Sequence, residues 1–266
     1  MIKTFLKIAW RTALRNRSFT AISLGSLVLG ITLFFLISLW VKDEMSYDAS
    51  FANQEQVCRL ESDMIRPDGQ VSKMSSVGWP IGKTLLAQYP EIEHLTYLRE
   101  WRPIIKQNET RFFEDALYAD DQFFAVFGYP LQEGDAATAL KHPYSVVLTQ
   151  AVKEKYFGKE DALGKVLMVN DTVPYKVTGV FAALPAATHL RFDMIGSFAS
   201  MCSLNPGMCE EELAGGWFDI NVYNYVRLNK NASLAATTAK IKNLVQVAGK
   251  KQLLKAVLKP TSPCVP

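Results

Sequence analysis

The chain has 266 residues with a formal net charge of +3, and 49% of its residues are hydrophobic. This length is enough for one large domain or two small ones with a hydrophobic core. The first 17 residues hold five of the 29 basic residues and no acidic residue, so the rest of the chain has 24 basic and 26 acidic residues. A body so close to neutral lacks the basic face that nucleic-acid binding requires, which excludes nucleic acid as a partner.

Residues 1–17 predict a basic amphipathic helix. Its apolar residues recur at helical spacing, and they are Ile2, Phe5, Leu6, Ala9, Trp10, Ala13 and Leu14. Its basic face at the membrane surface consists of Lys3, Lys7, Arg11, Arg15 and Arg17. Such a helix is expected to lie along the inner leaflet of a lipid bilayer, although the same basic residues also fit a plain flank of a spanning helix.

Residues 18–41 contain no charged residue and predict a transmembrane helix. A helix of this length extends roughly 36 Å, compared with about 30 Å for the hydrocarbon core of a bilayer. The apolar run is longer than that of a signal peptide, and no small-x-small cleavage site follows it. Basic residues precede the helix, whereas Lys42 follows it beside Asp43 and Glu44, so the positive-inside rule predicts a cytoplasmic N-terminus and an exported body.

Two pairs of small residues lie four positions apart in this helix. They are Ala21 with Gly25, and Ser26 with Gly30. Small residues at this spacing allow a second helix to approach closely, so these four positions are candidates for helix packing. Small residues are also common in spanning helices that have no partner, and the pattern leaves that alternative open.

From about residue 51 the pattern changes to short strands separated by turn signals, with a few helices. The first predicted elements are a hairpin of strands 56–64 and 70–75, a helix at 80–88 and strands at 95–105 and 110–119. A short helix follows Asp121 and ends at Gly128, and after a strand at 145–148 a helix at 150–157 is capped by Thr149 and ended by Gly158. The last predicted elements are a hairpin of strands 166–169 and 175–181, a strand at 221–228 and a helix at 234–247. This mixed order favours an α+β fold over a doubly wound sheet.

The stretch GWPIGKT at residues 78–84 has the ending of a phosphate-binding P-loop, but it fails the test for one. Three residues separate Gly78 from Gly82, whereas the P-loop needs four. Pro80 also removes one of the backbone N–H groups that would surround a phosphate. The stretch is better explained as the start of an ordinary helix at Pro80.

No other stretch predicts a catalytic residue, a cofactor or a metal site, so the protein is not expected to be an enzyme. The histidines, His94, His142 and His189, are isolated in the sequence, and no GxSxG or HExxH pattern occurs. Two of the four cysteines, Cys202 and Cys209, enclose a turn-like hexapeptide. In an exported body they form either a disulfide or two free thiols.

Four stretches together resemble the permease subunits of the MacB/FtsX-like group of ABC transporters. They are FLKIAWRTALRNRSFTAISLGSLVLGI, KDEMSYDASF, VVLTQAVKEKYFGKEDALGKVLMVNDTVPYKVTGVF and LPAATHLRFDMIGSF, and the resemblance covers roughly residues 1–250. It implies an α+β fold in which one N-terminal transmembrane helix is followed by a two-lobed mixed α/β core domain at 42–250, in the bacterial inner membrane with the core domain in the periplasm. One lobe would comprise about 51–108 and 188–250, and an inserted lobe about 109–187.

The resemblance also implies a function and its partners. Such a permease is non-catalytic and needs no cofactor: it couples a cytoplasmic ABC ATPase to the extracytoplasmic domain during export or release of a substrate, and it works with a second permease copy and an extracytoplasmic partner protein. Family permeases continue into further spans, whereas residues 251–266 are expected to be an irregular tail from a truncated or out-of-frame end. The alternative is a self-standing single-pass protein whose extracytoplasmic domain binds a ligand or a partner.

Overall fold

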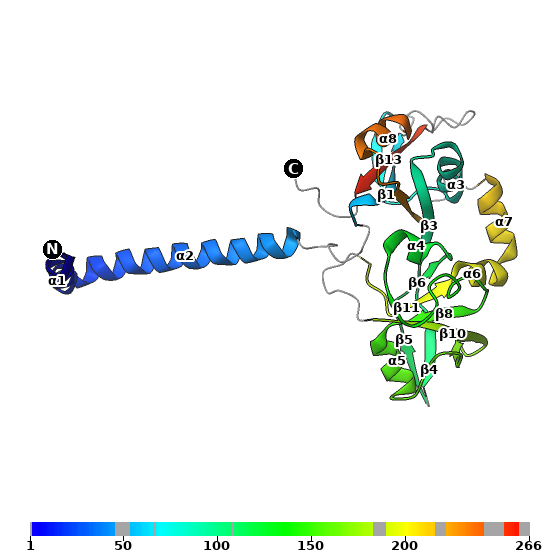
Figure 1. Ribbon diagram of the computed structural model, residues 1–266, viewed down its shortest axis with the longest axis horizontal. Helices are drawn as coiled ribbons and strands as arrows, with labels where there is room; N and C mark the ends of the chain where they lie inside the picture. The colour runs from blue at the N-terminus through cyan, green and yellow to red at the C-terminus, as the bar shows by residue number, and fades with distance from the viewer. Residues whose placement is uncertain are drawn as a thin grey trace. The chain divides into compact units, whose positions relative to one another are not determined.

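The computed structural model describes residues 2–45, 54–65, 68–107, 109–182, 190–215, 222–241 and 253–260. The chain divides into two compact units, Met1–Tyr47 and Asp48–Pro266 (Figure 1).

The first unit consists of two helices, α1 (Ile2–Arg15) and α2 (Arg17–Met45), which confirms the helices predicted at 1–17 and 18–41. The Thr20 hydroxyl donates a hydrogen bond to the Ala13 carbonyl across the junction, at 3.2 Å. Within α2, Arg17–Lys42 is long and apolar enough to cross a membrane, with a mean hydropathy of 2.3 and no buried residue. Large apolar side chains such as Phe34 and Trp40 are about two-thirds exposed, at 66% and 66%, as expected for a helix whose surroundings are lipid.

The second unit is built on one mixed sheet. In the part of the chain that the structure describes, its 13 strands follow the order β13-β1-β12-β3-β6-β11-β8-β10-β9-β4-β5, with β2 also paired to β1 and β7 to β10. The strands are β1 (Val57–Ile65), β2 (Val71–Met74), β3 (Ile92–Trp101), β4 (Ile104–Gln107), β5 (Thr110–Phe113), β6 (Ala116–Ala119), β7 (Leu131–Gly134), β8 (Ser145–Leu148), β9 (Val166–Val169), β10 (Val173–Phe181), β11 (Met194–Ser197), β12 (Tyr223–Leu228) and β13 (Leu253–Pro260). The pairs β10–β8 and β11–β6 are parallel and the other strand pairs of the described residues are antiparallel, so the mixed α/β architecture is confirmed.

The helices of this unit are α3 (Trp79–Gln88), α4 (Phe123–Phe127), α5 (Gln150–Phe157), α6 (Phe198–Leu204), α7 (Pro206–Gly215) and α8 (Leu234–Ile241), and a 3-10 turn, η1 (Gln54–Gln56), precedes β1. The local signals placed four of them correctly: α3, α4, α5 and α8. The Thr149 hydroxyl caps α5 by accepting a hydrogen bond from the Val152 N–H at 3.4 Å, and Gly158 follows the helix at φ +60°. Gly128 ends α4 in the left-handed conformation, at φ +70°. The predicted helix at 234–247 is confirmed up to Ile241, and its remainder lies outside the described residues.

Helices cover the two faces of the strands β1, β12, β3 and β6 unequally. Alternate strand residues point to opposite faces, and those on one face pack against α3, α6, α7 and α8. Those on the other face pack against α4, whose three phenylalanines are the centre of a second core. A third core lies between α5 and the strands β8, β9 and β10. Because α4 has only five residues, it covers only part of its face, and the candidate site lies in the remainder.

The structure corrects two predictions. The predicted strands 95–105 and 110–119 are each interrupted, by the segment at Arg102 and Pro103 and by that at Glu114 and Asp115, and the missing N–H group of Pro103 explains the first break. Residues 253–260, predicted as part of an irregular tail, form β13 and pair with β1 over eight positions, including Leu258 opposite Leu60. Leu258 is buried in the first core, so apolar contact selects the strand.

The division into two lobes stays a prediction. Strand β4 pairs with β5 and β9, which belong to the proposed inserted lobe, and β3 pairs with β6. Hydrogen bonding is therefore continuous across the expected boundary near residue 108.

Candidate binding cleft

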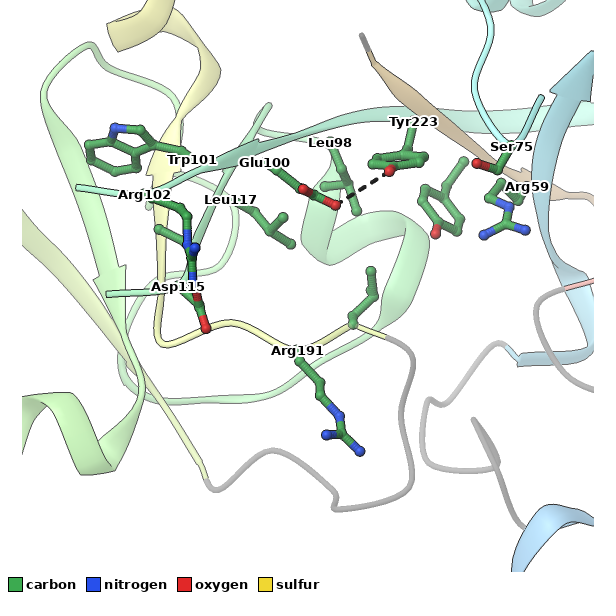
Figure 2. A pocket seen from close by; sticks show the side chains of 13 residues that line it. Arg59, Ser75, Leu98, Glu100, Trp101, Arg102, Asp115, Leu117, Arg191 and Tyr223 are labelled. Atoms are coloured by element: carbon green, nitrogen blue, oxygen red, sulfur yellow. Dashed lines mark hydrogen bonds and ion pairs between the residues drawn. The ribbon is translucent and has the colours of Figure 1, made fainter. Parts of the chain in front are cut away.

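The sheet face that α4 leaves open forms the floor of a cleft of about 460 Å³ (Figure 2). The register explains which residues meet there. Glu100 lies opposite Leu117, Leu98 lies opposite Tyr223, and Tyr225 lies opposite Arg59 on β1. Paired residues of an antiparallel ladder share a face, so these side chains from β1, β12, β3 and β6 gather over the same surface.

The lining consists mostly of charged and polar side chains, beneath which a few apolar side chains are largely buried. The residues that line the cleft are Arg59, Ser75, Leu98, Glu100, Trp101, Arg102, Asp115, Ala116, Leu117, Leu190, Arg191, Tyr223 and Tyr225. Leu98 and Leu117 are buried, at 1% and 7% exposure. Figure 2 shows Arg102 and Asp115 at one side, Arg59 and Ser75 at the other, Glu100 and Tyr223 between them, and Arg191 on a separate segment. A volume of this size lies in the range of about 300–1,000 Å³ typical of small-molecule sites.

Two of the three arginines on the rim are held by carboxylates. Arg59 pairs with Glu61 at 2.6 Å, and Lys259 on β13 pairs with the other oxygen of the same carboxylate. Burial by itself would raise the pKa of Glu61, but the hydrogen bonds from Lys259 and Arg59 outweigh it, so the pKa lies below its ordinary value. The Nε of Arg59 is buried and has no hydrogen-bond partner in the described part of the chain.

At the other side of the cleft, Arg102 pairs with Asp115 at 2.8 Å, and both side chains are largely exposed. The Asp115 N–H donates to the carboxylate of Asp193 at 3.0 Å. Burial raises the pKa of Asp193 in spite of this hydrogen bond, and the nearby charges of Glu114 and Asp115 act in the same direction.

Glu100 and Arg191 are the remaining charges on the rim. The Tyr223 hydroxyl donates a hydrogen bond to Glu100 at 3.3 Å, and burial followed by the charge of Glu100 raises the pKa of Tyr223. Neither Glu100 nor Arg191 forms an ion pair with a residue that the structure describes. The cleft therefore presents one negative and one positive group whose charges are not compensated within the described structure.

A second cluster of polar groups lies where β6 leads into α4. Asp120 accepts hydrogen bonds from the Thr96 hydroxyl at 2.5 Å and from the Gln122 N–H at 3.3 Å. Burial raises the pKa of Asp120 to about 7. The Gln122 side chain contacts His94, with 3.0 Å between Oε1 and Nδ1. These bonds hold the start of α4, which is a structural role.

The structure places GWPIGKT at the start of α3, with Pro80 in its first turn, as predicted. Gly82 is buried there against β3 and β12: a Cβ at this position would lie 2.5 Å from Asn224 Oδ1 and 3.0 Å from a methyl carbon of Leu95. The glycine is explained by this close packing of helix on sheet.

Cys202 on α6 and Cys209 on α7 are joined by a disulfide in the structure, with their Cα atoms 5.5 Å apart. The hexapeptide between them is mostly helical, since α6 ends at Leu204 and α7 begins at Pro206, so two helices that meet at Asn205 replace the turn that the sequence indicates. Formation of this disulfide in the cell stays a prediction.

The candidate residues of the first unit all lie on exposed helix surface. Gly25 and Gly30 have no atom of another residue near the position of an added Cβ, and Ala21 and Ser26 are exposed with them. The basic residues Lys3, Lys7, Arg11, Arg15 and Arg17 are exposed on α1 and at the start of α2. Packing with another helix and binding to lipid stay predictions.

The cleft itself was not foreseen from the sequence. Its residues come from four strands and four connecting segments, and no spacing in the chain relates them. Arg191 lies in a stretch quoted for the family resemblance, LPAATHLRFDMIGSF, but nothing in that stretch distinguishes it from a structural residue.

The apolar helix of membrane-spanning length and the mixed-sheet domain that follows it define the class of this protein, which is a membrane-anchored protein with a mixed-sheet domain. The model of the MacB-like periplasmic core domain matches residues 20–244, and the chain belongs to this family. The match includes most of α2 and almost all of the mixed sheet. No curated protein matches the chain in sequence.

Three solved structures have the same fold. A domain assigned to a permease protein of Porphyromonas gingivalis aligns with a TM-score of 0.64 at 20% identity, covering 79% of this chain and 92% of that one. The periplasmic region of MacB from Actinobacillus actinomycetemcomitans aligns with a TM-score of 0.50 at 16% identity, covering 76% and 88%. The extracellular domain of YknZ, a noncanonic ABC-type transporter of Gram-positive bacteria, aligns with a TM-score of 0.51 at 14% identity, covering 75% and 99%.

Proposed function

We propose that this chain acts as a permease component of an ABC-type transporter, with α2 in the inner membrane, α1 in the cytoplasm and the mixed-sheet domain in the periplasm. The observation that carries the proposal is that the family match at 20–244 includes both the apolar helix and the domain. The charge distribution supports the orientation, because five basic residues precede the span and the acidic residues Asp43 and Glu44 follow it.

The chain is non-catalytic in this proposal, and it transmits the work of a separate cytoplasmic ATPase to the periplasmic domain. The exposed basic helix α1 would lie between the lipid surface and the ATPase, while a second permease copy or another helix would pack on Ala21, Gly25, Ser26 and Gly30. The open space at Gly25 and Gly30 supports such packing, since a neighbouring backbone can approach closely there. An extracytoplasmic partner or the exported substrate would meet the mixed-sheet domain.

The first test determines orientation and partner together. The full chain with an N-terminal tag is expressed from its own locus, and spheroplasts are treated with trypsin. We expect the body to be digested while the tag stays protected until the membrane is opened. Purification from gently solubilised membranes should then recover an ATP-hydrolysing subunit. Digestion of the tag in intact spheroplasts would contradict the orientation, and the reproducible absence of an ATPase would contradict the coupling role.

The second candidate function is that of a single-pass protein whose periplasmic domain binds a ligand. The cleft favours it, because mechanical coupling does not need a 460 Å³ hollow lined by Glu100 and Arg191, which form no ion pair with a described residue. The same purification separates the two functions, because a single-pass binding protein needs no ATPase partner.

A further inference from the structure

The strands β5, β4, β9 and β10 are neighbours in the sheet, and one of their two faces is exposed in the part of the chain that the structure describes. The opposite face packs against α5 in the third core. Figure 1 shows β4, β5 and α5 together at one end of the domain. We call the exposed side of these four strands the open sheet face.

The register shows which residues share the open sheet face. Ile105 on β4 lies opposite Val169 on β9, and both side chains are buried in the third core. Because successive residues of a strand point to opposite faces, Ile104 and Met168 lie on the open side. Phe113 on β5 lies opposite Ile104, so its side chain belongs to the open side as well.

The open sheet face carries a row of apolar side chains. They are Ile104, Phe113, Val166, Met168 and Pro174. Phe113, Val166 and Met168 are 71%, 54% and 42% exposed. Single exposed apolar residues are common on proteins, but here each of the four strands contributes one, and the register makes them neighbours. Since the water-facing side of an antiparallel sheet ordinarily carries polar residues, this row indicates a surface that another molecule covers.

The charged residues at the strand positions of the open sheet face are all basic. They are Lys106, Arg111 and Lys176. Arg111 pairs with Asp171 in the turn between β9 and β10, at 2.6 Å. Neither Lys106 nor Lys176 forms an ion pair with a residue that the structure describes. A molecule that covers this face therefore gains from carrying acidic groups beside its apolar ones.

Charge and position argue against two other occupants. If the open sheet faces of two copies of the chain met, their basic groups would oppose one another, which is unfavourable. Anionic lipid has a suitable charge, but in the described sheet five strands separate β10 from β1, which is roughly 30 Å at about 4.8 Å per strand. The chain enters the sheet from α2 at β1, so the open sheet face is remote from that entry. Both arguments favour another protein.

We propose that the open sheet face docks an acidic amphipathic helix of an extracytoplasmic partner protein. The apolar stripe of that helix would lie on Phe113, Val166 and Met168, and its flanking carboxylates would meet Lys106 and Lys176. One helix fits, because four strands span about 14 Å between the outer two and a helix with its side chains is about 10–12 Å wide. The inference deepens the proposed function, and it rests on that function for the presence of the domain in the periplasm.

The test uses synthetic helical peptides as probes. The acidic peptide has about 18 residues, enough for an isolated helix to form, with leucines in one helical stripe and glutamates beside them. Its basic twin has lysine in place of every glutamate, and a scrambled peptide keeps the acidic composition without the stripe. Each is passed over immobilised phosphatidylcholine nanodiscs that hold the full chain, with empty nanodiscs as the blank, and binding is followed by surface plasmon resonance. We expect the acidic peptide to bind at least about tenfold more tightly than either of the others.

An apolar variant then locates the binding on the sheet. Val166→Ser should weaken binding of the acidic peptide about three- to fivefold, because the peptide loses an apolar contact. Val71→Ser is the matched control and should leave the affinity unchanged. Val71 is a strand valine with almost the same exposure, 55%, and it lies on β2, which pairs with β1 towards the other end of the sheet.

A charge variant tests the basic groups separately. The double variant Lys106→Gln with Lys176→Gln should weaken the acidic peptide about three- to tenfold and should also narrow its advantage over the basic twin. Lys73→Gln with Lys230→Gln removes the same charge at exposed positions outside the open sheet face, and it should change neither quantity.

The proposal is overturned if the acidic peptide does not bind, if the basic twin or the scrambled peptide binds as tightly, or if the control variants weaken binding as much as the variants of the open sheet face. Vesicles of phosphatidylglycerol and nanodiscs that hold the same chain are passed over the same surface. If either binds in a way that Val166→Ser weakens while the acidic peptide does not bind, the occupant is lipid or a second copy, and the proposal is wrong. These measurements involve no ATPase and no cell, so their failure and failure of the proposed transport role are distinguishable.

Discussion

Replacing Gly82 by alanine tests whether this glycine serves helix packing. The added Cβ would meet Asn224 Oδ1 at 2.5 Å and the two methyl carbons of Leu95 at 3.0 and 3.1 Å. Asn224 cannot move away cheaply, because it is fully buried and its Nδ2 donates to the carbonyls of Val77 and Val222 at 3.2 and 3.3 Å. Overpacking of this kind costs about 1–3 kcal/mol, whereas alanine gains up to about 1 kcal/mol in helix propensity.

The net destabilisation should therefore be about 1–2 kcal/mol, which corresponds to a decrease of about 2–8 °C in Tm for a domain of this size. The assay is thermal unfolding of the full chain in nanodiscs, followed by near-ultraviolet circular dichroism. Gly207→Ala on α7 is the matched control, because its Cβ would meet nothing within 4 Å, and it should be neutral or slightly stabilising. A Gly82→Ala protein as stable as the wild type would refute the packing explanation.

Four further predictions concern stability. Phe123→Ala should cost about 3–5 kcal/mol in urea unfolding, because this buried ring contacts the rings of several other aromatic residues in the second core, and a cost below about 1 kcal/mol would show that the core re-forms around the gap. Cys202→Ser should cost about 2–3 kcal/mol, and reductant should lower the Tm of the wild type but not of the variant; equal sensitivity of both proteins would mean that the disulfide is not formed. Thr149→Ala should cost about 1 kcal/mol through loss of the α5 cap, with Thr149→Ser as the control that restores it. Burial raises the pKa of Asp120 from 3.8 to about 7, so the folded protein retains a proton that the unfolded chain releases, and the contribution of this group to stability falls as pH rises through that window. Asp120→Asn should therefore make the unfolding midpoint less dependent on pH between about 4 and 7, and an unchanged slope would contradict the assignment.

Local signals in the sequence determined the elements that depend on a few neighbouring residues. The hairpin of β9 and β10 follows from Asn170 and Asp171, which adopt positive φ angles of 51° and 62° in the turn, a conformation that Asn and Asp tolerate better than most residues. The cap at Thr149 and the stop at Gly158 set the ends of α5 in the same way. The apolar length of α2 and the basic residues before it follow from composition alone.

Other elements depend on partners far away in the chain, and the sequence could not supply them. Residues 253–260 look like an irregular tail in isolation, and they form a strand because β1 offers an open edge and the first core has room for Leu258. Pairing of this strand also brings Lys259 to Glu61, and so changes the electrostatics beside the cleft.

The cleft shows most clearly which features the sequence determines and which depend on the tertiary structure. The sequence by itself determined the membrane helix, the family resemblance and the residues that cap or end the local elements, because each depends on contacts within a few positions. Only the tertiary structure decided that Glu100 and Arg191 line the same hollow, because that requires β1, β12, β3 and β6 to pair in register and α4 to end before it covers their face. Pairing across such sequence distances is fixed by the burial of the whole sheet, and no short stretch of the chain contains that information.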